Sequence, residues 1–135
     1  MKRIILVYVL AFTANWIWEI LHSILYLNYK GGIISNFILF RAALTDAVMV
    51  LILVFISQKF GKYKTTFILV GGLIIAVVIE IWALQTGRWT YNSLMPIIPF
   101  VKIGFTPVIQ LAITAYITEK IIHGSKIQKV YKSGI

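Results

Sequence analysis

The sequence predicts an all-α, polytopic membrane protein of four transmembrane helices with both termini in the cytoplasm. Hydrophobic residues make up 60% of the chain and charged residues only 13%, and the mean hydropathy is +0.91. Soluble domains carry about 25% charged residues, so this chain lacks the polar surface that water requires. Nearly uncharged runs of about 20 residues, the length that crosses a bilayer, follow one another. The 135 residues are enough for one domain, residues 1–135, and too few for two.

The first half of the chain contains two predicted spans. The first covers about residues 4–27. Basic residues precede it, as in a signal peptide, but the apolar run is too long and no small-residue cleavage site follows, so we expect the span to be retained. Gly31 and Gly32 favour a turn after it because glycine permits positive φ. The second predicted span covers about residues 33–57.

The second half of the chain contains two more predicted spans. The third covers about residues 65–86, and an aromatic-rich loop over residues 87–95 suits a membrane interface. The fourth covers about residues 97–123. Proline lacks the backbone donor and clashes with the preceding turn. We therefore expect a late helix start near Pro99 and a kink near Pro107.

The distribution of basic residues predicts the orientation in the membrane. With four spans, the two termini and the middle loop share one side, which collects nine basic residues. The opposite side holds only Lys30 and Arg88. Because positively charged loops stay in the cytoplasm, the side with nine is the inner one, and the sequence predicts a multi-pass protein of the cell (plasma) membrane. The nine are Lys2, Arg3, Lys59, Lys62, Lys64, Lys120, Lys126, Lys129 and Lys132.

Composition also excludes several classes of function. The chain has no cysteine, which excludes disulfides, thiolate nucleophiles and cysteine-ligated metal sites. A net charge of +9 suggests nucleic acid, but the basic residues flank apolar runs in short clusters and form no stripe that could follow phosphates. We therefore expect membrane lipids as partners and no nucleic acid. No HExxH or DxxD spacing is present, so we expect neither a metal nor another cofactor.

Ionisable residues inside the predicted spans mark the candidate site. Three of the four acidic residues, Glu19, Asp46 and Glu80, lie within spans. A charge at the centre of a span costs at least ~2.5–3.5 kcal/mol on insertion scales, so such residues mark functional sites by default. At 1.5 Å per residue, Glu19, Arg41, Glu80 and Lys102 fall in one layer of the outer half of the membrane, and Asp46 lies deeper.

Helical spacing places further polar residues beside these. On the first span, Asn15, Glu19, His22 and Tyr26 are spaced by four, three and four residues and form one stripe. Asp46 lies about 140° around its helix from Arg41, which predicts a different contact for it. Polar groups of this kind can also simply join helices by hydrogen bonds. The stripe predicted on the fourth span contains Lys102, Thr106, Gln110, Thr114 and Thr118.

These observations define the candidate residues. The candidate catalytic residues are Glu19, His22, Asp46 and Glu80, with His22 as the partner of a carboxyl group. The aromatic residues are typical of a membrane-interface belt, or else form a wall for an apolar or cationic guest. The candidate substrate-binding residues are Asn15, Trp18, Tyr26, Arg41, Trp82, Trp89, Tyr91, Lys102 and Gln110.

Two segments resemble known families. The segment from Asn15 to Tyr26, with Trp18 next to Glu19, resembles a helix of the membrane-integral terpene cyclases of fungal meroterpenoid pathways and some bacteria. That resemblance implies a catalytic carboxylic acid at Glu19, with a second acid at Asp46 or Glu80. Those cyclases have more spans than this chain, which suggests that it pairs with itself as a homo-oligomer.

The second resemblance covers about a quarter of the chain. The stretch from Glu80 to Gln110 carries the motif GRWxY, then MP, then G(F/L)(S/T)PxxQ. It resembles small bacterial membrane proteins of four spans whose function is unknown. The resemblance therefore implies a fold and not an activity.

The sequence leaves three functions open. The first is a membrane-integral enzyme, such as a cyclase or isomerase, that acts by acid–base chemistry on a hydrophobic isoprenoid or lipid substrate. A carboxyl group in an apolar site can stay protonated and can protonate an alkene, epoxide or leaving group. The alternative is a small proton- or cation-coupled transporter or binding protein that uses the same carboxylates. The third is a small subunit of a larger membrane complex.

Overall fold

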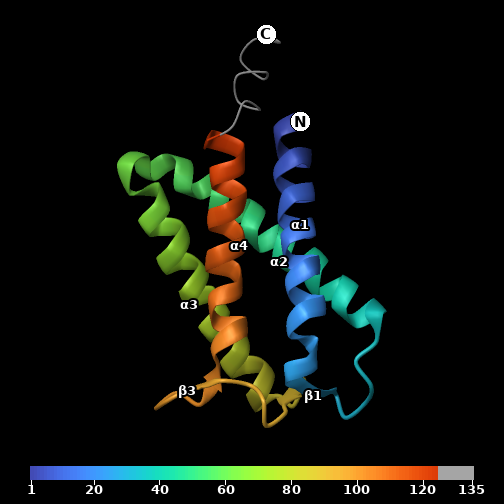
Figure 1. Ribbon diagram of the computed structural model, residues 1–135. Helices are drawn as coiled ribbons and strands as arrows, with labels where there is room; N and C mark the ends of the chain where they lie inside the picture. Colours follow the sequence, from blue (N-terminus) through green and yellow to red (C-terminus); the bar gives the residue numbers. More distant parts are fainter. Residues whose placement is uncertain (125–135) are drawn as a thin grey trace.

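The computed structural model describes residues 1–124, which are mostly helical (Figure 1). Lys126, Lys129 and Lys132, counted above in the charge bias, lie outside the described residues. The long helices are α1 (Lys2–His22), α2 (Asn36–Ser57), α3 (Lys64–Gln85) and α4 (Phe105–Gly124), and the 3-10 helices are η1 (Ser23–Leu25) and η2 (Gln58–Tyr63). By length and composition, two helical stretches are long and apolar enough to cross a membrane within this part of the chain. They are Lys2–Leu25 and Asn36–Gln85.

The helices run alternately up and down. The N-terminus and the end of α4 lie at one end of the bundle, and the strands lie at the other (Figure 1). α1 packs mainly against α2, and α3 mainly against α4. The longer apolar stretch reverses direction at Gly61, whose φ of 51° suits glycine, so α3 runs back toward the strand end, whereas α2 crosses the bundle obliquely (Figure 1).

The start of α2 is set by a cap. The sequence predicted a span from about residue 33, but the helix begins at Asn36. The Ser35 side chain accepts a hydrogen bond from the backbone N–H of Ile38 at 3.3 Å, which satisfies one of the free donors of the first turn. α1 ends at His22, five residues before the predicted end of the first span, and the bounds of α3 differ from the predicted ones by one residue at each end.

The predicted start of the fourth helix near Pro99 was wrong. Residues 97–104 form a hairpin, in which β3 (Ile97–Ile98) pairs antiparallel with β4 (Ile103–Gly104), and α4 begins at Phe105. Pro107 therefore falls in the first turn, where a missing N–H breaks no helical hydrogen bond. For the same reason the predicted kink at Pro107 is absent from α4.

A second small sheet joins the ends of α1 and α3. β1 (Tyr26–Tyr29) pairs antiparallel with β2 (Trp89–Tyr91), with Tyr26 opposite Tyr91. From the sequence, only a turn and a loop are predicted here. The pairing holds the aromatic side chains of both segments over the strand end of the bundle.

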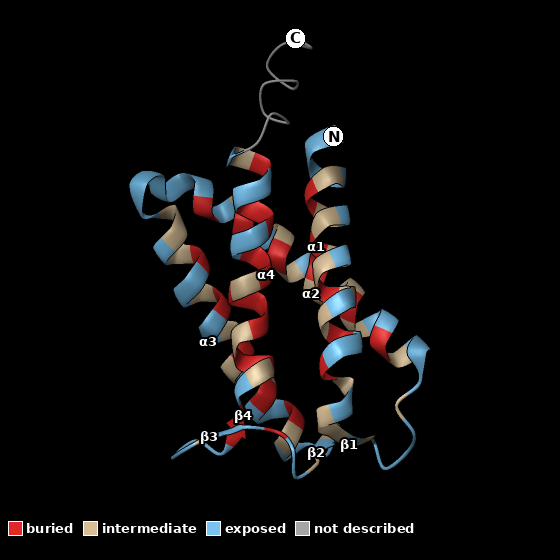
Figure 2. Cartoon of the chain, in the orientation of Figure 1, coloured by how far each residue is buried: buried red, intermediate tan, exposed pale blue. Residues whose placement is uncertain are grey.

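The core is narrow and made largely of small and branched side chains. At the crossing of α3 and α4, a Cβ on Gly72 would lie 2.7 Å from the backbone of Ala112, so only glycine permits this approach. The outward faces of the helices are rich in large apolar side chains, including Ile17, Val48 and Ile74 (Figure 2). The buried apolar core includes Val7, Ala11, Ala47, Val50, Ile68, Ala76, Leu111 and Ala115.

Candidate functional site

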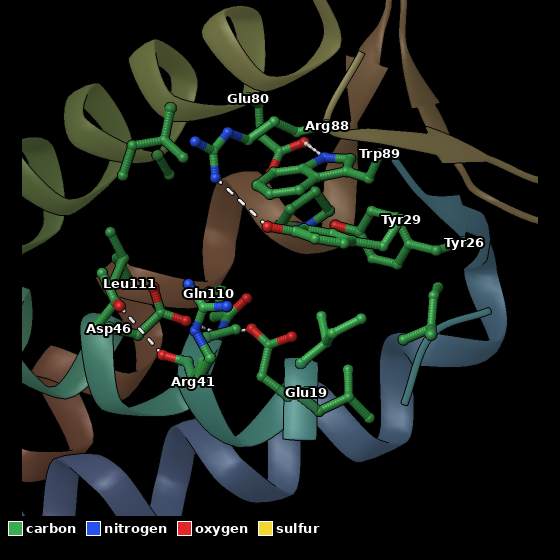
Figure 3. A pocket seen from close by; sticks show the side chains of 18 of the residues that line it. Glu19, Tyr26, Tyr29, Arg41, Asp46, Glu80, Arg88, Trp89, Gln110 and Leu111 are labelled. Atoms are coloured by element: carbon green, nitrogen blue, oxygen red, sulfur yellow. Dashed lines mark hydrogen bonds between the residues drawn. The ribbon is translucent and has the colours of Figure 1, made fainter. Parts of the chain in front are cut away.

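A cavity of about 310 Å³ lies near the strand end of the bundle (Figure 3). Its side walls come from α2 and α3, and its floor from Glu19 of α1 and from Pro107, Gln110 and Leu111 of α4. Residues of β1, together with Arg88 and Trp89, cover it from the strand end. Most of the wall is apolar, formed by Ile34, Ile38, Leu39, Ala42, Met49, Ala76 and Ile79.

One amide nitrogen binds three oxygen atoms on the floor of this cavity. Gln110 Nε2 lies 2.8 Å from Glu19 Oε1, 2.8 Å from Asp46 Oδ2 and 3.0 Å from Asn15 Oδ1. Because Glu19 Oε1 and Asp46 Oδ2 both lie 2.8 Å from the same nitrogen, these two oxygen atoms are at most twice 2.8 Å apart. Gln110, Glu19 and Asn15 are buried, so α1, α2 and α4 meet at a polar cluster within an apolar bundle.

His22 adds a titratable group to the same cluster. Its Nε2 lies 3.2 Å from Glu19 Oε2, the carboxyl oxygen that Gln110 does not contact. Its Nδ1 lies 3.4 Å from the hydroxyl of Thr106 on α4. Both ring nitrogens thus have partners, and the side chain is buried. The arrangement gives Glu19 an imidazole with which it can exchange a proton.

Glu80 enters the cavity from the opposite side. Its Oε2 accepts hydrogen bonds from the indole N–H of Trp89, at 3.2 Å, and from the hydroxyl of Tyr91. Burial, and then the hydrogen bond to Glu80, raises the pKa of the Tyr91 hydroxyl above its usual value. Tyr91 therefore keeps its proton and acts as a donor at neutral pH, and the carboxyl group is held in one orientation.

The cavity opens between α2 and α3. Three of its lining residues are exposed, Arg41 and Thr45 on α2 and Trp82 on α3. Arg88 lies beside this opening: its guanidinium stands 4.5 Å from the Trp82 ring and donates to the Tyr29 hydroxyl at 3.4 Å.

Most of the predicted site residues meet at this cavity. Asn15, His22 and Tyr91 do not line it, but each contacts a carboxyl group or its partner there. Trp18 lies outside the cavity and is half-buried. Its ring and the His22 ring form a T-shaped pair whose centres are 6.4 Å apart. The predicted residues that do line the cavity are Glu19, Tyr26, Arg41, Asp46, Glu80, Trp82, Trp89 and Gln110.

Lys102 was placed wrongly by the sequence analysis. It was predicted in the layer of Glu19, on a helix starting near Pro99. It lies instead in the exposed turn between β3 and β4, with a φ of 55°. The stripe that it was expected to begin is present from Thr106 onward, and Gln110, Thr114 and Thr118 are buried.

Sequence reasoning missed Arg88 and Tyr29 as site residues. Arg88 belongs to the GRWxY motif and was counted only as a loop charge, and Tyr29 lies just before the turn predicted at Gly31 and Gly32. The pairing of β1 with β2 brings both to the cavity, and no local pattern encodes that pairing. One feature of the sequence could have pointed to Arg88, since it is one of only two basic residues expected in the outer loops.

The opposite end of the bundle holds a second polar cluster. The Lys64 ammonium lies 2.7 Å from Glu119 Oε1, and His123 Nδ1 lies 3.0 Å from the same oxygen. Arg3 donates to His123 Nε2 at 2.7 Å. These contacts join α1, α3 and α4. The carboxyl group is almost fully buried, with 1% of its side chain exposed.

No family model, no curated protein and no solved structure matches the chain, so the chemistry of the site is inferred from its geometry. Within residues 1–124, no three His, Asp or Glu side chains are grouped so as to hold a metal ion. The cavity offers carboxyl groups, an imidazole, aromatic faces and apolar walls, a set suited to moving protons to and from an apolar guest.

Proposed function

We propose that this protein is a membrane-integral enzyme that transfers protons to and from an isoprenoid or other lipid held between α2 and α3. One observation carries the proposal. Carboxyl groups from three helices, Glu19, Asp46 and Glu80, line a single cavity whose remaining walls are mostly apolar and aromatic. Ionisable groups at membrane depth are costly, and helix packing alone would need fewer of them.

The proposal includes four membrane spans with both termini in the cytoplasm. The longer apolar stretch, Asn36–Gln85, reverses at Gly61, so its two halves would each cross the bilayer. α4 has 20 residues, about 30 Å at 1.5 Å per residue, and lies against the other three helices. The basic residues near the N-terminus and in η2 sit at the end that would face the cytoplasm.

The pair Glu19 and Asp46 is the proposed proton donor. The Gln110 NH₂ group has two hydrogens and three oxygen neighbours, so it cannot serve all three fully. Two carboxylates this close in an apolar site repel each other strongly, and the arrangement that relieves the repulsion is one shared proton. His22 can return a proton to Glu19 after turnover.

Glu80 is the proposed acceptor. A proton given by the pair to an alkene carbon leaves a carbocation, which Tyr26, Trp82 and Trp89 can stabilise through their ring faces. Loss of a neighbouring C–H proton to Glu80 then gives an isomerised or cyclised product with no net change in protons. These roles agree with what the resemblance of residues 15–26 to terpene cyclases implies for Glu19.

Deuterium transfer tests the proposal. The protein in liposomes is incubated in D₂O with a panel of polyprenyl alcohols, their epoxides and the lipid extract of the expression host. We expect at least one lipid to be converted to a product that carries deuterium on carbon. Glu19→Gln, Asp46→Asn and Glu80→Gln should abolish the conversion, because an amide neither gives nor takes a proton at neutral pH.

Glu119→Gln is the matched control, since it makes the same change at the opposite end of the bundle. We expect it to retain the conversion. Folded variants of Glu19, Asp46 and Glu80 that convert the lipid at the wild-type rate would refute the catalytic assignment. Thermal unfolding in detergent shows whether each variant is folded.

A second candidate function is proton or cation transport. Its supporting observation is the buried stripe on α4, in which Thr114 and Thr118 continue from Gln110 toward Glu119 at the other end. Each hydroxyl donates to a backbone carbonyl one turn earlier, so its oxygen can still accept a bond. A pH-sensitive dye inside liposomes would report the flux, and Thr114→Val should block it if the stripe conducts.

A further inference from the structure

Two arginine side chains line the cavity without an ion pair. Arg41 of α2 and Arg88, which follows α3, both belong to its wall. Three carboxyl groups line the same cavity, yet in residues 1–124 neither guanidinium lies within ion-pair distance of any of them. The acids are instead bound by Gln110, His22, Trp89 and Tyr91.

The neighbours of these guanidiniums position them and leave their charge available. Arg88 stacks on the Trp82 ring at 4.5 Å and makes one long hydrogen bond, of 3.4 Å, to the Tyr29 hydroxyl. Arg41 is exposed and stands 5.9 Å from the centre of the Phe37 ring. Aromatic faces hold an arginine without satisfying its five N–H donors, so both can still bind an anion.

Each arginine lies nearer the strand end of the bundle than the acid on the same helix or on the helix that it follows. Arg41 precedes Asp46 by five residues on α2, which is about 7.5 Å along the helix. Arg88 lies beyond the end of α3, whereas Glu80 lies more than one turn inside it. Figure 3 shows Arg88 beside Glu80 on one side of the cavity, and Arg41 with Glu19, Asp46 and Gln110 on the other. An anionic group between the two arginines would leave an attached apolar chain to run past the acids.

We infer that the cavity binds a lipid with a phosphate headgroup, with the phosphate held by Arg41 and Arg88 and one apolar chain between α2 and α3. Guanidinium groups match phosphate oxygens in geometry and charge. A volume of about 310 Å³ is at the lower end for ligand pockets, which suits a single chain. This inference rests on the proposed function and names its substrate class.

Three probes separate the headgroup from the chain. Farnesyl monophosphate has both, farnesol has only the chain, and inorganic phosphate has only the headgroup. Their dissociation constants are measured by calorimetry on the full chain in nanodiscs of phosphatidylcholine. We expect farnesyl monophosphate to bind at least about tenfold more tightly than either of the others, because hydrogen bonds to a charged group contribute about 1.5–3 kcal/mol.

Substitutions test whether the arginines are responsible. Arg41→Gln and Arg88→Gln should each weaken farnesyl monophosphate binding about tenfold and leave farnesol binding unchanged. Lys30→Gln and Lys102→Gln are the matched controls, since both remove an exposed positive charge at the same end of the bundle, and neither should alter binding. Arg88→Lys should bind less tightly than the wild type, because lysine lacks the planar fork and the stacking on Trp82.

Several outcomes would overturn the inference. If farnesol binds as tightly as farnesyl monophosphate, no headgroup site exists. If inorganic phosphate binds as tightly as farnesyl monophosphate, the site binds the free ion and not a lipid. An equal loss of binding in Lys102→Gln would show a general charge effect. Wild-type protein that binds farnesyl monophosphate through the arginines but transfers deuterium to none of the lipids would remove the proposed function and leave the headgroup site standing.

Discussion

At the scale of single residues, Gln110 is the group that joins three helices. Its amide nitrogen contacts Glu19 of α1, Asp46 of α2 and Asn15 of α1, while the residue itself belongs to α4. An amide can donate to carboxyl oxygens whether or not they are protonated. A glutamine here therefore tolerates a proton moving between the two acids, which a cation or a third acid would not.

Replacement of Gln110 by leucine should destabilise the fold. Three oxygen atoms would lose their shared donor, and a buried polar group left without a partner costs about 1–3 kcal/mol. We expect a lower thermal midpoint in detergent for Gln110→Leu. Gln85→Leu, the same change at an exposed position of α3, is the control and should leave the midpoint unchanged. Equal midpoints for the two variants would contradict this account of the cluster.

At the scale of the helices, α3 packs closely against α4 and less closely against α2. The backbones of α3 and α4 approach at Gly72 and Ala112, where any Cβ would be only 2.7 Å from the neighbouring chain. α2 and α3 contact each other less than α3 contacts α4. The cavity occupies the space between α2 and α3, so tight packing of α3 onto α4 helps to keep that space open.

Gly72→Ala should separate α3 from α4. The alanine methyl would overlap backbone atoms of Ala112, which cannot move as a flexible side chain can, and overpacking typically costs about 1–3 kcal/mol. This cost opposes a gain of about 1 kcal/mol from the better helix propensity of alanine. We expect a lower thermal midpoint. Gly124→Ala, where a Cβ meets nothing within 4 Å, should show no loss, and a Gly72→Ala protein as stable as that control would be inconsistent with the observed packing.

The ion pair of Lys64 and Glu119 joins α3 to α4 at the other end. Glu119 is nearly fully buried, whereas 29% of the Lys64 side chain is exposed. The two partners are therefore not equivalent. Loss of the lysine leaves a buried carboxylate with only His123 beside it, and loss of the glutamate leaves a lysine that can still reach solvent.

Lys64→Met should cost more stability than Glu119→Gln. Breaking a buried pair so that one charge remains costs about 3–5 kcal/mol, and the partial exposure of Lys64 places this case at or below the lower bound. Lys62→Met removes an exposed charge nearby and should be neutral. The double variant Lys64→Met with Glu119→Leu should regain much of the loss. Unfolding in detergent measures all four, and a larger loss in Glu119→Gln than in Lys64→Met would reverse the assignment.

At the scale of the whole molecule, apolar side chains cover the sides of the helical bundle, and basic residues gather at one of its ends. Large apolar side chains cover the outward faces of the helices (Figure 2). The N-terminus, the end of α4 and η2, with its basic residues, lie at one end, and the strands and the cavity lie near the other (Figure 1). In the proposed membrane orientation, the cavity opens sideways to lipid in the outer half of the bilayer.

Reporter fusions test this orientation. Alkaline phosphatase, which is active only outside the cytoplasm, should be active when fused after residue 30 or residue 90. Green fluorescent protein, which fluoresces only in the cytoplasm, should fluoresce when fused after residue 62 or at the C-terminus, because positive loops remain inside. A fluorescent fusion after residue 90 would mean that the end of α3 lies in the cytoplasm, which contradicts the proposed orientation.

The helical class and much of the candidate site can be read from the sequence alone. Long apolar runs of this length favour helices, whose backbone groups bond within the segment, and α1, α2 and α3 lie close to their predicted bounds. The spacing of Asn15, Glu19 and His22 placed them on one helix face, and all three are buried together. The helical period is a local property, and therefore it can be read from the chain alone.

Which groups meet depends on the tertiary structure. Asp46 makes a different contact from Arg41, as expected, because it accepts a hydrogen bond from Gln110. Both residues nevertheless line the cavity, since α2 crosses the bundle obliquely (Figure 1). Arg88 reaches the site through the pairing of β1 with β2, and Lys102 leaves it because β3 and β4 replace the first turns of the predicted helix. Crossing angles and strand pairing depend on contacts between distant segments, which periodicity along one segment does not specify.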